Sequence, residues 1–151
     1  MSILTKNDSH RYLILIGSEY CPALKIPSLE RVNSDIENIK KIFSDEMQGY
    51  TLPLEEMINW RSTDIITTLK NFFSPGKLSS SDNVIVYYSG HGDTDGAFKD
   101  HYLFTLDSRS NNIAGTAIKT EALVECFFEN FENGAFPNVL LVRSRVKTTA
   151  F

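Results

Sequence analysis

The fold of this chain is decided by the stretch VIVYYSGHG at positions 84–92, in which an unbroken apolar run gives way to a histidine between two glycines. A continuous apolar run of this length is typical of a strand buried on both faces of a parallel sheet. Open α/β sheets keep their chemistry at the carboxyl edge, so we expect His91 at that edge. Gly90 and Gly92 can take backbone angles that other residues avoid and can let another segment approach closely, which suits a histidine that faces a substrate. The alternative is a strand that ends in an ordinary turn with an incidental histidine.

Apolar runs of strand length alternate with segments of helical period along the rest of the chain, which predicts the α/β class. Further strands are expected at residues 12–16, 57–60, 101–107 and 139–142. Three helices are expected, the first from Ser34, which forms a capping box with Glu37, the second from Ser62 or Thr63, and the third from Thr120. No internal repeat or boundary divides the sequence, so residues 1–151 are expected to form a single domain.

Composition excludes several classes of partner. The chain has 151 residues, a formal net charge of -4 and no basic cluster, which argues against nucleic acid or an anionic membrane as the main partner. No apolar stretch is long enough to span a bilayer, and the first residues lack the pattern of a signal peptide. A cytoplasmic protein is therefore expected.

The sequence shows no pattern of a metal site or a disulfide framework. The two cysteines, Cys21 and Cys126, have neither the number nor the spacing of a disulfide framework or a zinc site. The acidic stretch at 93–96 lacks the further ligands of an EF-hand loop and is interpreted as a polar turn, and His101 as a surface histidine. No cofactor or metal is expected.

Two segments together resemble a known family. YSGHG at 88–92 followed by YLFTLD at 102–107 resembles the catalytic-histidine region of caspase-like cysteine peptidases, most of all metacaspases and their bacterial relatives. Residues 29–36 resemble the family's segment before its first helix, and the resemblance covers residues 11–142. It implies a three-layer caspase-like fold with a mostly parallel central sheet flanked by helices, whose carboxyl-terminal part is missing from this chain.

The resemblance also implies a chemistry. In such peptidases a thiolate attacks the peptide carbonyl, while an imidazole lowers the pKa of the thiol and then protonates the leaving amine. The resemblance assigns the imidazole to His91 and an oxyanion-binding backbone N–H to Gly92. It places Asp35 in the pocket for an Arg or Lys before the scissile bond, with Ser89 beside it. Asp35 also has a simpler explanation, because the first turn of any helix favours an acidic side chain.

The nucleophile is absent from the position where the family has it. The strand at 139–142 is followed by Arg143, Ser144 and Arg145, which places Arg143 at the family's aspartate position and Arg145 at its cysteine position. A guanidinium cannot act as a nucleophile. Cys21, just past the first strand, could approach the same edge of the sheet, whereas Cys126 is interpreted as a core residue.

Three functional hypotheses follow from the sequence. The first is a caspase-like cysteine endopeptidase domain in a truncated or frame-altered chain that is inactive by itself. The second is a pseudoprotease that binds a polypeptide or an active relative without cutting it. The third is an unrelated α/β domain that binds a small ligand at the sheet edge. The strand at 139–142 is also expected to leave an unpaired edge through which the chain could associate with itself.

Overall fold

The computed structural model describes residues 9–94, 100–129, 131, 136–144 and 146–147. Within these residues the strands are β1 Arg11–Ser18, β2 Met57–Ile58, β3 Asn83–Thr94, β4 His101–Leu103, β5 Ile118–Lys119, β6 Asn138–Arg143 and β7 Val146–Lys147. The helices are α1 Val32–Ser44, α2 Ser62–Phe72, α3 Ile113–Thr116 and α4 Thr120–Phe128, with a 3₁₀ turn, η1, at Pro22–Leu24.

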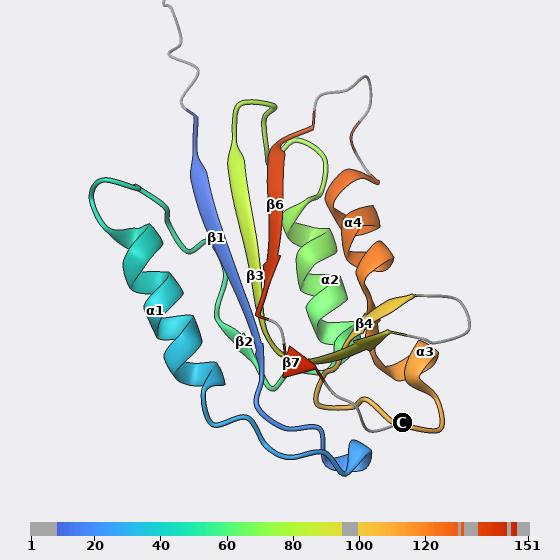
Figure 1. Ribbon diagram of the computed structural model, residues 1–151. Helices are drawn as coiled ribbons and strands as arrows, with labels where there is room; N and C mark the ends of the chain where they lie inside the picture. The colour runs from blue at the N-terminus through green and yellow to red at the C-terminus, as the bar shows by residue number, and fades with distance from the viewer. Residues whose placement is uncertain (1–8, 95–99, 130, 132–135, 145, 148–151) are drawn as a thin grey trace, which may run out of the picture.

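The longest strand, β3, organises the sheet (Figure 1). It pairs in parallel with β1, β6 and β7 and antiparallel with β4, which in turn pairs antiparallel with β5. Strand β2 lies on the far side of β1 and is parallel to it. The described strands therefore form a mixed sheet with order β2-β1-β3-β4-β5 along its main path. The α/β class expected from the sequence is confirmed.

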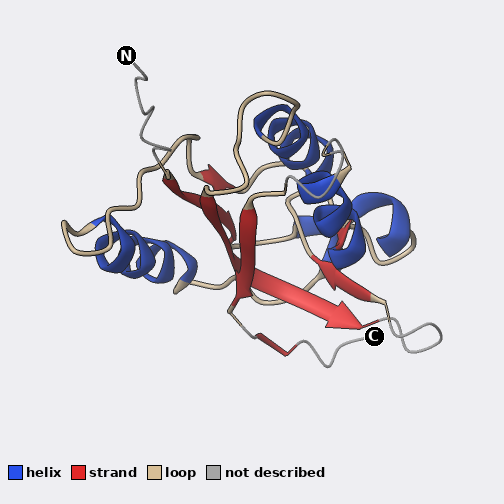
Figure 2. Cartoon of the chain, turned by 90° about the horizontal axis from the view of Figure 1, so that it is seen from above, coloured by secondary structure: helices blue, strands red, loops and turns tan. Residues whose placement is uncertain are grey.

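Helices cover both faces of this sheet, which explains the unbroken apolar run in β3. Side chains alternate along a strand, so Val84, Val86 and Tyr88 contribute to one core cluster with residues of α2 and α4. Ile85 and Tyr87 point the other way and pack with residues of α1. Figure 2 shows α1 on one side of the strands and the other long helices on the opposite side. Every position of the run is thus buried.

The first helix does not begin where the capping pattern predicts. Helix α1 starts at Val32, and the Ser34 hydroxyl donates a hydrogen bond to the Arg31 carbonyl at 2.9 Å. Val32 is buried against Gly17 of β1, where an added Cβ would lie 2.8 Å from Val32 Cγ1. Close packing on the sheet sets this helix start, so the predicted capping box at Ser34 is wrong.

The other predicted elements need smaller changes. Helix α2 begins at Ser62 as expected, but a distant side chain caps it, because the Ser62 backbone N–H donates to Asp107 Oδ1 at 2.9 Å. Helix α4 begins at Thr120 as expected, without a side-chain cap. The strand expected at 101–107 ends at Leu103, and the sequence predicted neither α3 nor β5.

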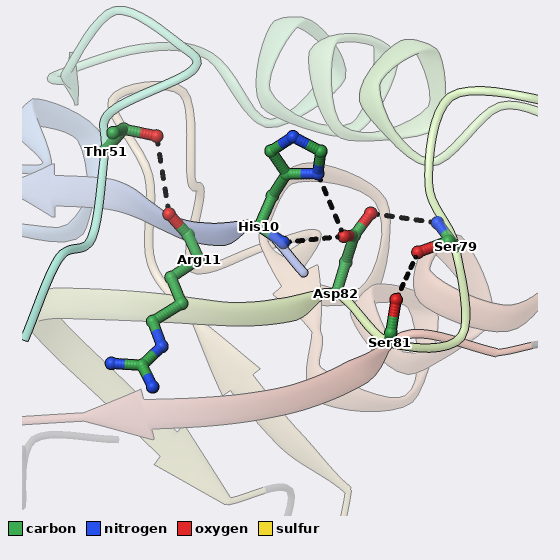
Figure 3. A network of polar contacts seen from close by, with 6 residues as sticks. All are labelled: His10, Arg11, Thr51, Ser79, Ser81 and Asp82. Atoms are coloured by element: carbon green, nitrogen blue, oxygen red, sulfur yellow. Dashed lines mark hydrogen bonds and ion pairs between the residues drawn. The ribbon is translucent and has the colours of Figure 1, made fainter. Parts of the chain in front are cut away.

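A buried carboxylate joins the amino ends of three strands (Figure 3). Asp82 Oδ1 accepts from the His10 N–H and Oδ2 from the Ser79 N–H, each at 2.9 Å. The Asp82 carbonyl accepts from the Asn138 N–H at 2.9 Å, at the start of β6. Burial opposes ionisation of Asp82, but these hydrogen bonds outweigh it and lower its pKa. Asp82 therefore fixes β1, β3 and β6 at the edge opposite His91.

Candidate active site

His91 lies where the sheet changes from parallel to antiparallel pairing. The parallel pairing of β1 with β3 ends at Ser18 opposite Gly90, and from Gly92 onward β3 pairs antiparallel with β4. The prediction that the strand stops at His91 is wrong, because β3 continues to Thr94. The prediction that His91 lies at the carboxyl edge of the parallel strands is confirmed by this register.

The imidazole of His91 is buried and oriented by a backbone carbonyl. The side chain is 3% exposed, and its Nε2 lies 2.7 Å from the carbonyl oxygen of Pro27. A carbonyl oxygen only accepts hydrogen bonds, so Nε2 is the donor in this contact. The His91 carbonyl accepts from the Phe104 N–H at 2.9 Å and lies 2.7 Å from the Tyr88 hydroxyl. Both the ring and the main chain of His91 are therefore held in place.

The positions on either side of His91 have no room for a side chain, so glycine is needed at both. Among the described glycines the positive φ angles belong to Gly49 and Gly76, so Gly90 and Gly92 do not use the backbone angles that other residues avoid. The expectation of close approach is confirmed. A Cβ on Gly90 would collide with the Tyr88 hydroxyl, and one on Gly92 would lie 2.8 Å from the Tyr102 carbonyl oxygen.

The predicted pocket residues lie together on the same face of β3 as His91. Ser89 and His91 are two positions apart on the strand and so share a face. The Ser89 hydroxyl donates to Asp35 Oδ2 at 3.1 Å and accepts from the Ser144 hydroxyl at 3.2 Å. Asp35 is half-buried and comes from the first turn of α1. The structure thus brings Asp35, Ser89 and His91 to one region, with Ser144 as an additional member.

The pKa of Tyr87, which neighbours this cluster, is raised by burial and by Asp35. Hydrogen bonds with Ser144 and Ser89 partly oppose this increase in the pKa. A negative charge on Asp35 therefore acts within the cluster, where it would attract a cation.

The segment that follows β6 approaches β3 beside these residues. Arg143 is exposed and pairs in register with Tyr88, and the Ser144 N–H donates to the Tyr88 carbonyl at 2.9 Å. Val146 in β7 pairs with His91. The predicted nucleophile position, Arg145, lies outside the described residues, but its two sequence neighbours both contact the His91 region of β3.

Neither cysteine has the surroundings of an activated thiol. Cys21 is 2% exposed and lies 3.6 Å from the Ser18 hydroxyl, and burial raises its pKa. Cys126 is buried on α4, and burial raises its pKa too. Reactive cysteines need a lowered pKa and access to solvent, and these two have the opposite properties. The interpretation of Cys126 as a core residue is confirmed.

Other candidate sites remain without support. In the described part of the chain, no group of three or more His, Cys, Asp or Glu side chains is arranged to hold a metal ion. Residues 95–96 of the predicted polar turn lie outside that part. His101 is exposed, as expected, with Nδ1 3.1 Å from the Thr94 hydroxyl. No helix within the described ranges is long and apolar enough to cross a membrane.

Sequence reasoning missed two contributors to the site. The Pro27 carbonyl is a backbone group, so its residue type carries no information about the contact with His91. Ser144 lies between two arginines, and nothing in this local sequence indicates that its hydroxyl contacts Ser89. The parallel pairing of β3 with β6 is what brings its hydroxyl to Ser89.

The comparison with known families agrees with this geometry. The family model of the caspase domain matches residues 10–128, which includes β1, α1, β3 and His91. The chain therefore belongs to the caspase-domain family of peptidases. The match ends before β6 and does not extend to residues 143–145. A comparison with curated proteins found no match.

Proposed function

We propose that this chain is a caspase-like cysteine endopeptidase domain of the metacaspase type, which acts on polypeptides after Arg or Lys through a Cys/His dyad. In this proposal residues 1–151 belong to one three-layer catalytic domain. With Arg145 at the nucleophile position, the chain by itself does not cleave. The observation that carries the proposal is the placement of an oriented His91 beside the Ser89–Asp35 hydrogen bond.

His91 is suited to act as the base. Nε2 donates a hydrogen bond to the Pro27 carbonyl, which orients the ring. We assign to the imidazole the roles of taking the proton of a thiol and later giving it to the leaving amine. An imidazolium that forms during this step is stabilised by the same carbonyl. We assign the oxyanion-binding N–H to Gly92, the residue that follows His91.

Asp35 is suited to select a basic side chain. Its carboxylate is half-buried at the helix start, and Ser89 donates to one of its oxygens at 3.1 Å, which fixes its orientation. A fixed carboxylate pairs with a guanidinium in a bidentate manner and with an ammonium as a point charge. We therefore propose Arg or Lys before the scissile bond, with Arg preferred.

A second function is favoured by one observation. The pocket contact between Ser89 and Asp35 is present, whereas Cys21 and Cys126 are both buried with raised pKa values. A domain with these properties would bind basic polypeptides without cutting them, as a pseudoprotease does. Two buried, unpaired thiols fit the reducing cytoplasm, which we propose as its location.

We also propose self-association through β6. Among the described strands β6 pairs with β3 alone, and Leu140 on it is 57% exposed. Leu140 is paired with Ile85, and Ile85 packs with residues of α1. Leu140 therefore lies on the same face of the sheet as α1. An apolar edge strand of this kind is a template for pairing with another chain.

Cleavage of fluorogenic peptides with Arg, Lys or Asp before the scissile bond tests the proposal. The present chain is compared with a variant carrying Arg143→Asp and Arg145→Cys, alone and extended by the carboxyl half of a family member. We expect activity on Arg and Lys peptides only after substitution, and its loss on His91→Ala. Asp35→Asn should remove the preference for basic residues. If no substituted form cleaves any peptide, the pseudoprotease function is favoured. If the present chain cleaves peptides and Cys21→Ala abolishes that cleavage, the proposal is overturned.

A further inference from the structure

A cavity lies beyond the carboxyl ends of β1 and β2, lined by residues that the proposed catalysis does not use. It has a volume of about 290 Å³, and its polar wall is formed by Arg61, Asp107 and Arg109. Its apolar wall includes Pro22 of η1 and Leu106. The arginines come from the start of α2 and from the loop after β4, so folding brings them together from distant parts of the chain.

The two arginines have no carboxylate partner in the part of the chain that the structure describes. The ion pairs found there, at up to 4.0 Å, involve other residues. Asp107 lines the same cavity, but its Oδ1 already accepts from the Ser62 N–H at 2.9 Å and the Thr105 hydroxyl at 2.7 Å, and its Oδ2 accepts from the Ser62 hydroxyl at 3.2 Å. Burial opposes ionisation of Asp107, yet these bonds outweigh it and lower its pKa, so it is ionised near neutral pH. The cavity keeps a net charge of one positive unit.

The backbone that carries each arginine is anchored. The Arg109 N–H donates to the Thr116 hydroxyl at 2.8 Å, and that hydroxyl donates to the Asn112 carbonyl at 2.6 Å. Just before Arg61, Asn59 has a positive φ of 59°, and its amide donates to Glu19 Oε2 at 2.9 Å. Arg61 and Arg109 are both exposed, and their backbone positions are held by these contacts.

We propose that this cavity binds the carboxylate of a Glu or Asp side chain on the polypeptide that the domain recognises. The inference rests on the proposed function in taking a polypeptide as the partner. Two guanidinium forks match a carboxylate, and the Pro22 and Leu106 wall suits its hydrocarbon stem.

The cavity is connected to the candidate active site through one loop. Pro22, which lines the cavity, and Pro27, which orients His91, lie on the same connection between β1 and α1. A polypeptide that reaches both places would offer an acidic side chain to the arginines and a basic one to Asp35. The cavity would then add a second element of selectivity to the domain.

The single tryptophan of the chain gives a local readout. Trp60 lines a neighbouring cavity that shares Arg61 and Leu106 with this one. Trp60 emission is followed during titration with a capped Gly-Gly-Glu-Gly-Gly peptide, the Gln analogue and inorganic phosphate. We expect saturable binding of the Glu peptide that added NaCl weakens, and no binding of the Gln analogue. Equal binding of both peptides would overturn the proposal, and tighter binding of phosphate would overturn its carboxylate assignment.

Substitutions locate the binding and separate it from the proposed catalysis. Arg61→Gln and Arg109→Gln should each raise the midpoint of the Glu-peptide titration about tenfold, because each removes a hydrogen bond between charged groups. Lys70→Gln, elsewhere on α2, should leave the midpoint unchanged. Thermal unfolding of each variant verifies that it is folded. An unchanged midpoint in Arg109→Gln refutes this inference alone, whereas failure of the substituted chain to cleave peptides refutes the proposed function alone.

Discussion

The substitution Asp82→Asn tests the reasoning about the amino edge of the sheet. Asp82 Oδ1 accepts from the His10 N–H at 2.9 Å and lies 3.2 Å from His10 Nδ1, while Oδ2 accepts from the Ser79 N–H at 2.9 Å. Asparagine keeps one acceptor oxygen and places an amide NH₂ at the other position. If the oxygen faces His10, the NH₂ faces the Ser79 N–H, and two donors oppose each other.

The magnitude follows from those contacts. A hydrogen bond to a charged group contributes about 1.5–3 kcal/mol, and the unpaired N–H adds a cost that partly overlaps with that loss. We expect the free energy of unfolding to fall by about 2–3 kcal/mol. For a domain of this size each kcal/mol lowers the melting temperature by about 2–4 °C, so a decrease of about 5–10 °C is expected.

The effect should depend on pH with a definite sign. The pKa of Asp82 is lowered in the folded state, so its stabilisation is present above the unfolded Asp value of about 3.9 and is lost as the pH falls through the folded pKa. Urea unfolding at pH 7 and pH 3 measures this, with the exposed Glu30→Gln as the control. A difference from the unmodified chain below about 0.5 kcal/mol at pH 7, or one equally large at pH 3, would refute the reasoning.

Three further predictions concern the site and the sheet edge. Gly92→Ala should lower the free energy of unfolding by about 1–3 kcal/mol in urea, because its Cβ would lie 2.8 Å from the Tyr102 carbonyl oxygen; stability equal to that of the unmodified chain would contradict this. Cys21 and Cys126 should react with a thiol reagent at pH 8 far more slowly than free cysteine and at normal rates in denaturant, since burial raises both pKa values; fast reaction of the folded chain would show otherwise. Leu140→Lys should leave the melting temperature nearly unchanged and shift sedimentation toward the monomer, whereas unchanged association would exclude β6 as the contact.

The strands and the histidine could be predicted because their pattern is local. A strand that is buried on both faces needs apolar residues at every position, and the unbroken apolar run that begins the stretch 84–92 shows this directly. The start of α1 could not be predicted, because Val32 packs on Gly17 of a distant strand and this contact outweighs the local preference at Ser34. For the same reason the cap of α2 was missed, since the carboxylate of Asp107 lies far along the chain.

The side chains of the candidate site could be proposed from the sequence, whereas the backbone group that orients His91 could not. Asp35, Ser89 and His91 were all identified from sequence, and the structure brings them to one face of β3. The Pro27 carbonyl, which orients His91, has no signature in the residue type, and the role of Ser144 depends on how β6 pairs with β3. Contacts made by the main chain require the tertiary structure.

The proposed function requires His91 to activate a thiol introduced at position 145, and the pKa of that thiol is the measurement that decides it. The rate of alkylation by iodoacetamide is measured against pH in the Arg145→Cys chain, with and without His91→Ala, while the buried Cys21 and Cys126 react slowly. We expect a thiol pKa well below the ordinary cysteine value of about 8.5 when His91 is present, and a return to that value when His91 is replaced. The same pKa in both proteins would contradict it.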